Sequence, residues 1–132
     1  MVIDHMGLPD AAQGIAQPAF QCLLSLTGGG HAWAKLSGAD RITRASANLR
    51  DALPFMRALA QAASQRLVWG SDWPNIGFHS REQVRDDRPL AHRELDAGEP
   101  LDFLAEAVPD AEARRAILVS NPEALYAFPT SS

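Results

Sequence analysis

The fold is decided by one stretch of this sequence, Arg66-Leu67-Val68-Trp69-Gly70-Ser71-Asp72-Trp73-Pro74. Its unbroken apolar run, Leu67 to Trp69, is typical of a strand with both faces buried. Gly70 ends that run, and Pro74 prevents the chain from continuing as a regular ladder. Residues just beyond the carboxyl ends of parallel strands face the ligand crevice, so Asp72 is the best candidate for a chemical group. The alternative is that Asp72 only caps a following turn or helix.

Two short apolar runs precede this stretch, and the sequence predicts them as strands, at Val2–His5 and at residues 32–38. A helix is expected between them, with Pro18 in its first turn and a stop at Gly28-Gly29-Gly30. A second helix, with Asp51 as its N-cap, is expected before the third strand. The residues predicted to face the core from these two helices are Phe20, Leu23, Leu24, Thr27, Leu53, Met56, Ala60 and Ala63.

The C-terminal half begins with a long polar segment, about Asn75 to Glu99, and continues with short helices. Segments of this length without regular structure are usually functional or poorly ordered. Strands that alternate with helices indicate right-handed crossovers and a parallel sheet. Three strands cannot close a barrel, so the expected fold is a piece of an α/β protein that occupies residues 1–132.

Composition and charge exclude several classes of function. The 132 residues are 46% apolar and 21% charged, as in an ordinary globular domain. The net charge is -4 and the basic residues are scattered, so nucleic acid is not an expected partner. No apolar run reaches the roughly 20 residues of a membrane span, and the N-terminus does not read as a signal peptide. The single cysteine fits a reducing compartment, and we expect a cytoplasmic location.

Four segments together resemble the amidohydrolase 2 family of the amidohydrolase superfamily, whose members are TIM barrels. The segments come in the family's order: Val2-Ile3-Asp4-His5-Met6-Gly7, Trp33-Ala34-Lys35-Leu36-Ser37-Gly38, Leu67 to Pro74, and Asn121-Pro122-Glu123-Ala124-Leu125-Tyr126-Ala127-Phe128. Within that family the sequence is most similar to the 2-pyrone-4,6-dicarboxylate lactonases. The resemblance covers nearly the whole chain and implies the C-terminal portion, about three β/α units, of a TIM barrel.

The resemblance also implies what this sequence lacks. A TIM barrel takes about 250 residues, and the family's His-x-His pair at the end of the first barrel strand does not occur in this sequence. We therefore expect the product of a split, truncated or mis-started gene, incomplete on its own. Relatives often have histidine where this chain has Asn75, and whether His79 takes that place is left open.

By resemblance, three residues carry the chemistry. Asp72 resembles the family's last-strand aspartate, which implies a general base that activates the hydrolytic water. His5 resembles the strand-end histidine that polarises the lactone carbonyl or helps to hold a metal. Arg41 resembles a loop arginine that binds a substrate carboxylate, a task that suits the guanidinium fork. Taken alone, His5 can be structural and Arg41 can be an ordinary solvated side chain.

Other chemical side chains are assigned no catalytic role. Lys35 alternates with apolar neighbours, so it points into the barrel or lies on the surface at a strand end, and the second is favoured. Cys22 is expected to pack in the core. A catalytic zinc takes three ligands from the protein, and this sequence offers His5 and Asp72. Lactonases of the branch that it resembles work without a metal, so the resemblance implies no metal, and no other cofactor is expected.

The leading hypothesis is the C-terminal part of a lactone hydrolase of the 2-pyrone-4,6-dicarboxylate type, inactive in isolation. Its expected partners are a lactone or dicarboxylate substrate and either copies of itself or a chain that supplies the missing strands. Two alternatives remain open: a non-catalytic remnant or assembly module, and a metal-dependent hydrolase or decarboxylase of the same family. Sequence alone does not separate them.

Overall fold

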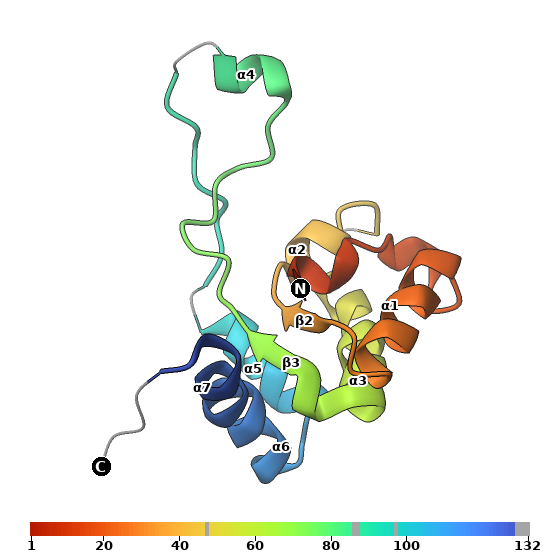
Figure 1. Cartoon of the computed structure of the whole chain (residues 1–132). Coiled ribbons are helices and arrows are strands. Elements are labelled where there is room, and N and C mark those ends of the chain that lie inside the picture. The colour runs from red at the N-terminus through yellow and green to blue at the C-terminus, as the bar shows by residue number, and fades with distance from the viewer. Residues whose placement is uncertain (47, 86–87, 97, 129–132) are drawn as a thin grey trace.

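Three short strands form one open parallel sheet in the order β1-β2-β3 (Figure 1). The computed structural model describes residues 1–46, 48–85, 88–96 and 98–128. Strand β1 covers Val2–Ile3, β2 covers Trp33–Leu36 and β3 covers Leu67–Trp69. The predicted α/β class with parallel strands is thus confirmed. The first two strands are shorter than predicted, because the backbone turns into positive φ at His5 and at Gly38.

The register of the sheet separates its two faces. Ala34 lies opposite Ile3 and Leu67, and Leu36 lies opposite Trp69, so these side chains share one face. That face belongs to the core, in which Ala34, Leu36 and Leu67 are completely buried. The other face carries Trp33, Lys35 and Val68. Lys35 therefore points away from the helical core.

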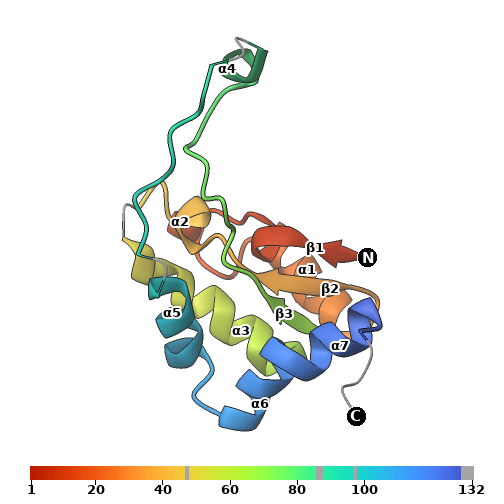
Figure 2. The ribbon, with the colours of Figure 1, turned by 90° about the vertical axis from the view of Figure 1, so that its left-hand side faces the viewer.

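Helices α1 (Pro18–Gly28), α3 (Leu53–Ala63) and α5 (Glu99–Ala107) supply most of the remaining core. Figure 2 shows α3 running along the sheet, and α5 lies on the side of α3 that faces away from the strands. Each of the three begins with a proline in its first turn, where the missing N–H costs little. The rings of Phe20 and Phe55 meet edge to face at 4.8 Å and join α1 to α3.

Some details of these helices differ from the predictions. The N-cap of α3 is Ala52, because Asp51 lies within a 3-10 turn, Leu49–Ala52, that is itself capped by the Asn48 side chain. The buried face of α3 also differs: Phe55 and Leu59 are buried, whereas Ala60 and Ala63 are only half-buried. Cys22 is exposed, so the prediction that it packs in the core is wrong.

The long polar segment forms a protruding arm, defined here as the described residues 75–85 and 88–93 (Figure 1). The short helix α4 (Arg81–Arg85) lies at its tip. At its base the two limbs pair in antiparallel fashion: the Gly77 amide donates to the Ala91 carbonyl at 2.6 Å, and the Arg93 amide donates to the Asn75 carbonyl at 2.6 Å. The arm thus leaves the end of β3 and returns to it.

The last part of the chain packs beside β3. It consists of α6 (Ala111–Arg115), a π-helical turn (Ala116–Ser120) and α7 (Asn121–Tyr126). A short helix α2 (Ala39–Ile42) and the 3-10 turns Asp4–Gly7, Ala11–Gln13 and Ser64–Arg66 complete the described elements. In the part of the chain that the structure describes, no helix has the length and apolar character needed to cross a membrane.

Candidate active site

The chain turns sharply after every strand, and these turns bring the candidate residues to one edge of the sheet. His5 follows β1 with φ 51°, Gly38 follows β2 with φ 62°, and Asp72 follows β3 with φ 61°. Positive φ is uncommon outside glycine and costs free energy in a residue with a side chain. Backbone strain of this kind clusters at functional sites. Here it falls on two of the three residues predicted to carry the chemistry.

The first feature of the site is the approach of His5 to Asp72. Imidazole Nε2 lies 3.6 Å from carboxylate Oδ1, although the two residues are 67 positions apart in the sequence. The other ring nitrogen, Nδ1, lies 2.9 Å from the hydroxyl of Ser37, at the end of β2. All three strand ends thus contribute to one constellation.

Gly38 makes this approach sterically possible. A Cβ at position 38 would lie 2.8 Å from His5 Nδ1 and 3.0 Å from Arg41 Cδ, closer than such atoms pack. The imidazole and the arginine stem therefore occupy the space that a side chain at Gly38 would need. Glycine also accepts the left-handed backbone at that position.

Two guanidinium groups hold the other carboxylate oxygen of Asp72. Arg41 Nε donates to Oδ2 at 2.6 Å, and an Arg93 terminal nitrogen donates to the same oxygen at 2.7 Å. Arg93 comes from the end of the arm and also forms an ion pair with Asp40 on α2. Sequence reasoning placed Arg41 in a loop near the site but missed Ser37, Asp40 and Arg93. The only signal for Arg93 was the polar character of its segment.

These contacts fix the charges of the two central groups. Burial by itself would raise the pKa of Asp72, but hydrogen bonds from Arg41 and Arg93 outweigh it and hold that pKa below its usual 3.8. Burial lowers the pKa of His5 below its usual 6.5, although the Asp72 carboxylate opposes this. At neutral pH the site therefore holds an ionised Asp72 beside a neutral His5.

A pocket of about 460 Å³ opens beside this pair, a volume in the range of small-molecule sites. His5, Ser37 and Asp72 line it, together with Lys35, whose ammonium lies 2.6 Å from Asp4. The hydrogen bond to Asp4 raises the pKa of Lys35 above its usual 10.5. The favoured surface position for Lys35 is therefore wrong, since the residue lines the pocket. The remaining lining residues are Asp4, Trp69, Gly70, Ser71, Trp73 and Tyr126.

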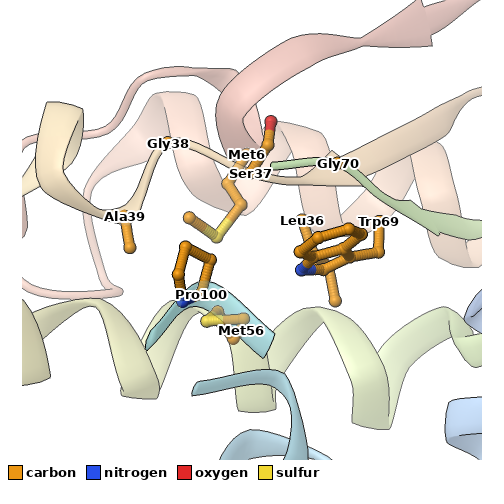
Figure 3. Close-up of a pocket in the computed structure, with 9 residues that line it drawn as sticks. All are labelled: Met6, Leu36, Ser37, Gly38, Ala39, Met56, Trp69, Gly70 and Pro100. Atoms are coloured by element: carbon orange, nitrogen blue, oxygen red, sulfur yellow. The ribbon is translucent and has the colours of Figure 1, made fainter. Parts of the chain in front are cut away.

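A second, much smaller gap lies between the strand ends and the helices (Figure 3). The side chains of Met6, Met56 and Pro100 converge on it, with the Trp69 indole to one side. Its volume, about 20 Å³, suits nothing larger than a water molecule. The pocket beside His5 and Asp72, in contrast, is large enough for a small molecule.

The residues present do not by themselves make a metal site. No group of three or more His, Cys, Asp or Glu side chains suited to a metal ion occurs within the described ranges. His5 and Asp72 are only two ligands, and two guanidinium groups next to Asp72 oppose a further cation. The metal-free site remains a prediction.

Comparison with known proteins gives the family. The sequence profile of the Amidohydro_2 amidohydrolases matches residues 1–128. The chain belongs to this amidohydrolase family. A 4-sulfomuconolactone hydrolase from Rhizobium radiobacter is 38% identical over 126 residues, which are 96% of this chain and 39% of that protein. A 2-pyrone-4,6-dicarboxylate hydrolase from Comamonas testosteroni is 30% identical over 135 aligned residues. The alignment covers 96% of this chain and 40% of that protein.

A solved structure agrees with these relatives. A candidate 2-pyrone-4,6-dicarboxylic acid hydrolase from Pseudomonas putida superposes with a TM-score of 0.71 at 33% identity, covering 98% of this chain and 44% of that one. This amidohydrolase chain therefore spans about two fifths of the length of its curated relatives. The predicted relation to part of a TIM-barrel amidohydrolase is confirmed.

The structure also bears on the open question of Asn75 and His79. The Asn75 amide donates to the Asp72 carbonyl at 2.9 Å, so Asn75 closes the turn that follows the aspartate. His79 lies out on the arm of this amidohydrolase, exposed, with Nδ1 2.9 Å from the Gly77 carbonyl oxygen. Its side chain does not line the pocket beside Asp72, and nothing supports it as a replacement for the missing histidine.

Proposed function

We propose that this chain is the C-terminal part of a hydrolase for a lactone that bears carboxylates, of the 2-pyrone-4,6-dicarboxylate type. One observation carries the proposal: an ionised carboxylate and a neutral imidazole from different strands lie 3.6 Å apart beside an open pocket. A general base and a carbonyl-polarising group must sit together in this way for ester hydrolysis. The names of the relatives, hydrolases of two lactones, support the substrate class.

In the proposed reaction Asp72 takes a proton from a water molecule in the pocket. The resulting hydroxide adds to the lactone carbonyl carbon, and the carbonyl π electrons move to its oxygen. Collapse of this tetrahedral oxyanion breaks the ring carbon–oxygen bond, and the leaving oxygen receives the proton that Asp72 had taken. The products are a carboxylic acid and the hydroxyl compound, or its keto form, from the opened ring.

His5 is suited to stabilise the oxyanion. When the Ser37 hydroxyl donates to Nδ1, the neutral ring carries its proton on Nε2, the atom next to Asp72 and the pocket. That N–H donates to the lactone carbonyl oxygen and strengthens its bond as negative charge develops. Ser37 thus sets the tautomer that the reaction needs.

Arg41 is the proposed group for a substrate carboxylate. Its guanidinium is always charged and can pair with both oxygens of a carboxylate. In this structure it already engages one carboxylate, that of Asp72, at 2.6 Å. A dicarboxylate lactone would offer it a second one.

A second candidate, a non-catalytic remnant or assembly module, is favoured by the share of the relatives that this chain covers, about two fifths. A metal-dependent hydrolase or decarboxylase would need further ligands from another chain. The experiment is hydrolysis of 2-pyrone-4,6-dicarboxylate, followed by loss of the ring absorbance. It uses the chain alone, the chain mixed with the N-terminal part of the Comamonas relative, and both with added zinc or chelator.

We expect no measurable hydrolysis by the chain alone and metal-independent hydrolysis by the mixture. Asp72→Asn should lower the rate of the mixture by at least about 100-fold, the usual size of a general-base effect. Asp102→Asn, an exposed charge on α5, is the matched control and should keep full activity. An inactive mixture that nevertheless assembles would favour the non-catalytic module, and activity that is lost with chelator would favour the metal-dependent branch.

A further inference from the structure

Asp72 Oδ2 accepts hydrogen bonds from two arginines, and the surroundings of these arginines differ sharply. The Arg93 side chain is only 8% exposed, whereas the Arg41 side chain is 28% exposed. A charge that is buried to this extent is stable only when its hydrogen-bonding groups are engaged. The two arginines are therefore not equivalent partners of the carboxylate.

Arg93 is held from three parts of the fold. One terminal nitrogen donates to Asp72 at 2.7 Å, and the other donates to the Ile76 carbonyl at 2.5 Å. Its Nε forms an ion pair with Asp40 on α2, although the geometry is not that of a hydrogen bond. Its guanidinium lies 5.2 Å from the centre of the Phe78 ring. Moving Arg93 would break all of these contacts together.

Arg41 has a single side-chain partner within the described residues. Its Nε donates to Asp72, and its two terminal nitrogens make no side-chain pair there. It sits on the one-turn helix α2, where its side chain is partly open to solvent. A competing carboxylate would have to displace only this one contact.

We propose that Arg93 is a positioning residue that fixes the Asp72 carboxylate and ties the arm to the site, while Arg41 exchanges between Asp72 and an anionic ligand. The proposal rests on the proposed function, since it treats Asp72 as the group to be positioned. With Arg93 in place, Oδ1 keeps facing His5 and the pocket when Arg41 leaves. Through Arg93, the arm then helps to position the Asp72 carboxylate at the edge of the sheet.

The exchange has a consequence for the basicity of Asp72. With both arginines bound, the pKa of Asp72 is held low, which makes it a weak base. An anionic ligand that takes Arg41 removes one of these hydrogen bonds and raises the pKa. His5 and Lys35 also face the carboxylate electrostatically, and Asp40 acts on it through Arg93. The base would thus gain strength only when a carboxylate-bearing substrate is present.

The test needs no turnover, because it follows Asp72 and the arm directly. Carbon-13 spectra of the labelled carboxyl group give the pKa of Asp72, with and without isophthalate as an aromatic dicarboxylate probe. Amide hydrogen exchange at Gly77 and at residue 93 reports the pairing at the base of the arm. The variants are Arg93→Gln, Arg93→Lys and Arg41→Gln, and the control Arg81→Gln removes an exposed arginine from the same arm.

Arg93→Gln should raise the pKa of Asp72 and accelerate exchange of the two amides by about tenfold, the effect of one lost charge-assisted hydrogen bond. Arg41→Gln should raise the pKa but leave exchange unchanged, and Arg81→Gln should change neither. Isophthalate should raise the pKa in the wild-type chain and in Arg93→Lys, and should have no effect in Arg41→Gln.

The proposal is overturned if Arg93→Gln leaves the pKa and the exchange as they are in Arg81→Gln, or if isophthalate still shifts Asp72 in Arg41→Gln. Should Arg93→Gln not fold, Arg93→Lys decides, because lysine keeps the charge but cannot bridge Asp72, Asp40 and the Ile76 carbonyl. Exchange as slow as in Arg81→Gln would then contradict the proposal. If the mixture with the N-terminal part of the Comamonas relative assembles but hydrolyses no lactone, while the chain still shows these shifts, the proposed function is refuted and the positioning role stays intact.

Discussion

At the scale of single residues, the site depends on left-handed backbone where the strands end. His5, Gly38 and Asp72 all have positive φ, and only one of them is glycine. The surrounding contacts compensate the strain: Ser37 and Asp72 face His5, and two arginines hold Asp72. Such strain persists only where the neighbours over-determine it. Changes at these positions should therefore affect geometry and stability together.

Gly38→Ala is expected to lower the free energy of unfolding by about 1–3 kcal/mol and to move the His5 ring. The new Cβ meets His5 Nδ1 at 2.8 Å, and alanine is strained at φ 62°. Gly30→Ala is the matched control, since Gly30 also has positive φ (75°) but a new Cβ there meets Arg66 only at 3.5 Å. Urea unfolding and the His5 imidazole spectrum measure both effects. An equal loss in the two variants, with His5 unmoved, would contradict the steric account.

Acidification should lower stability through both central groups. Asp72 has a lowered pKa in the folded chain. Its contribution to stability is therefore complete above pH 3.8 and is lost as the pH falls through the pKa of the folded state. His5 also has a lowered pKa in the folded chain. Its contribution to stability is complete above pH 6.5 and decreases as the pH falls below 6.5. Urea unfolding at several pH values should show losses in both windows. Asp72→Asn should remove the loss below 3.8, and a curve of unchanged shape in that window would contradict the role of Asp72.

At the scale of elements, a few polar contacts join segments that are far apart in the sequence. Arg93 joins the arm to the end of β3 and to α2. Asn121 joins α7 to the start of β3, since its buried side-chain amide donates to the carbonyls of Ser64 at 2.8 Å and Leu67 at 2.7 Å. α7 is thereby fixed alongside the start of β3 (Figure 2).

Asn121→Ala is expected to lower the free energy of unfolding by about 1–3 kcal/mol, because it removes two hydrogen bonds from the Asn121 amide, one of them buried. Glu123→Ala changes an exposed side chain on the same helix and should have little effect. Urea unfolding of both variants gives the comparison. Equal stabilities would show that packing alone, without the amide, holds α7 on β3.

At the scale of the whole molecule, the sheet is open at both sides. In the order β1-β2-β3 the outer edges of β1 and β3 have no strand neighbour within the described residues. Unpaired edges next to apolar side chains favour association. Trp73, at the mouth of the pocket, is 81% exposed, which adds to this tendency.

The isolated chain should therefore be oligomeric or poorly stable. Sedimentation should give a mass above the monomer, or urea should unfold the chain at a low concentration. Val2→Lys places a charge on the edge strand β1 and should reduce the association. A stable monomer with the same sedimentation as Val2→Lys would contradict this expectation, and would show that the helices protect the open sheet sufficiently.

Much of the architecture follows from local sequence. The apolar run Leu67–Trp69 gives β3 with the predicted bounds, and Pro18 with the glycines after Thr27 gives the limits of α1. Hydrophobic periodicity and turn chemistry act over a few residues, so they can be read directly. The order of strands and helices then fixes a parallel sheet, and His5 and Asp72 must lie at the same edge of it.

Tertiary structure decided the rest of the site. Arg93 reaches Asp72 across 21 positions only because the arm folds back on itself, and no local pattern encodes that return. Ser37 meets His5 because of the strand register, and Lys35 lines the pocket because alternation sets its face relative to the helical core. The sequence by itself determined the strands, the parallel sheet and the shared edge of His5 and Asp72. The charges that surround Asp72 depend on distances between segments remote in the chain, and those distances exist only in the folded molecule.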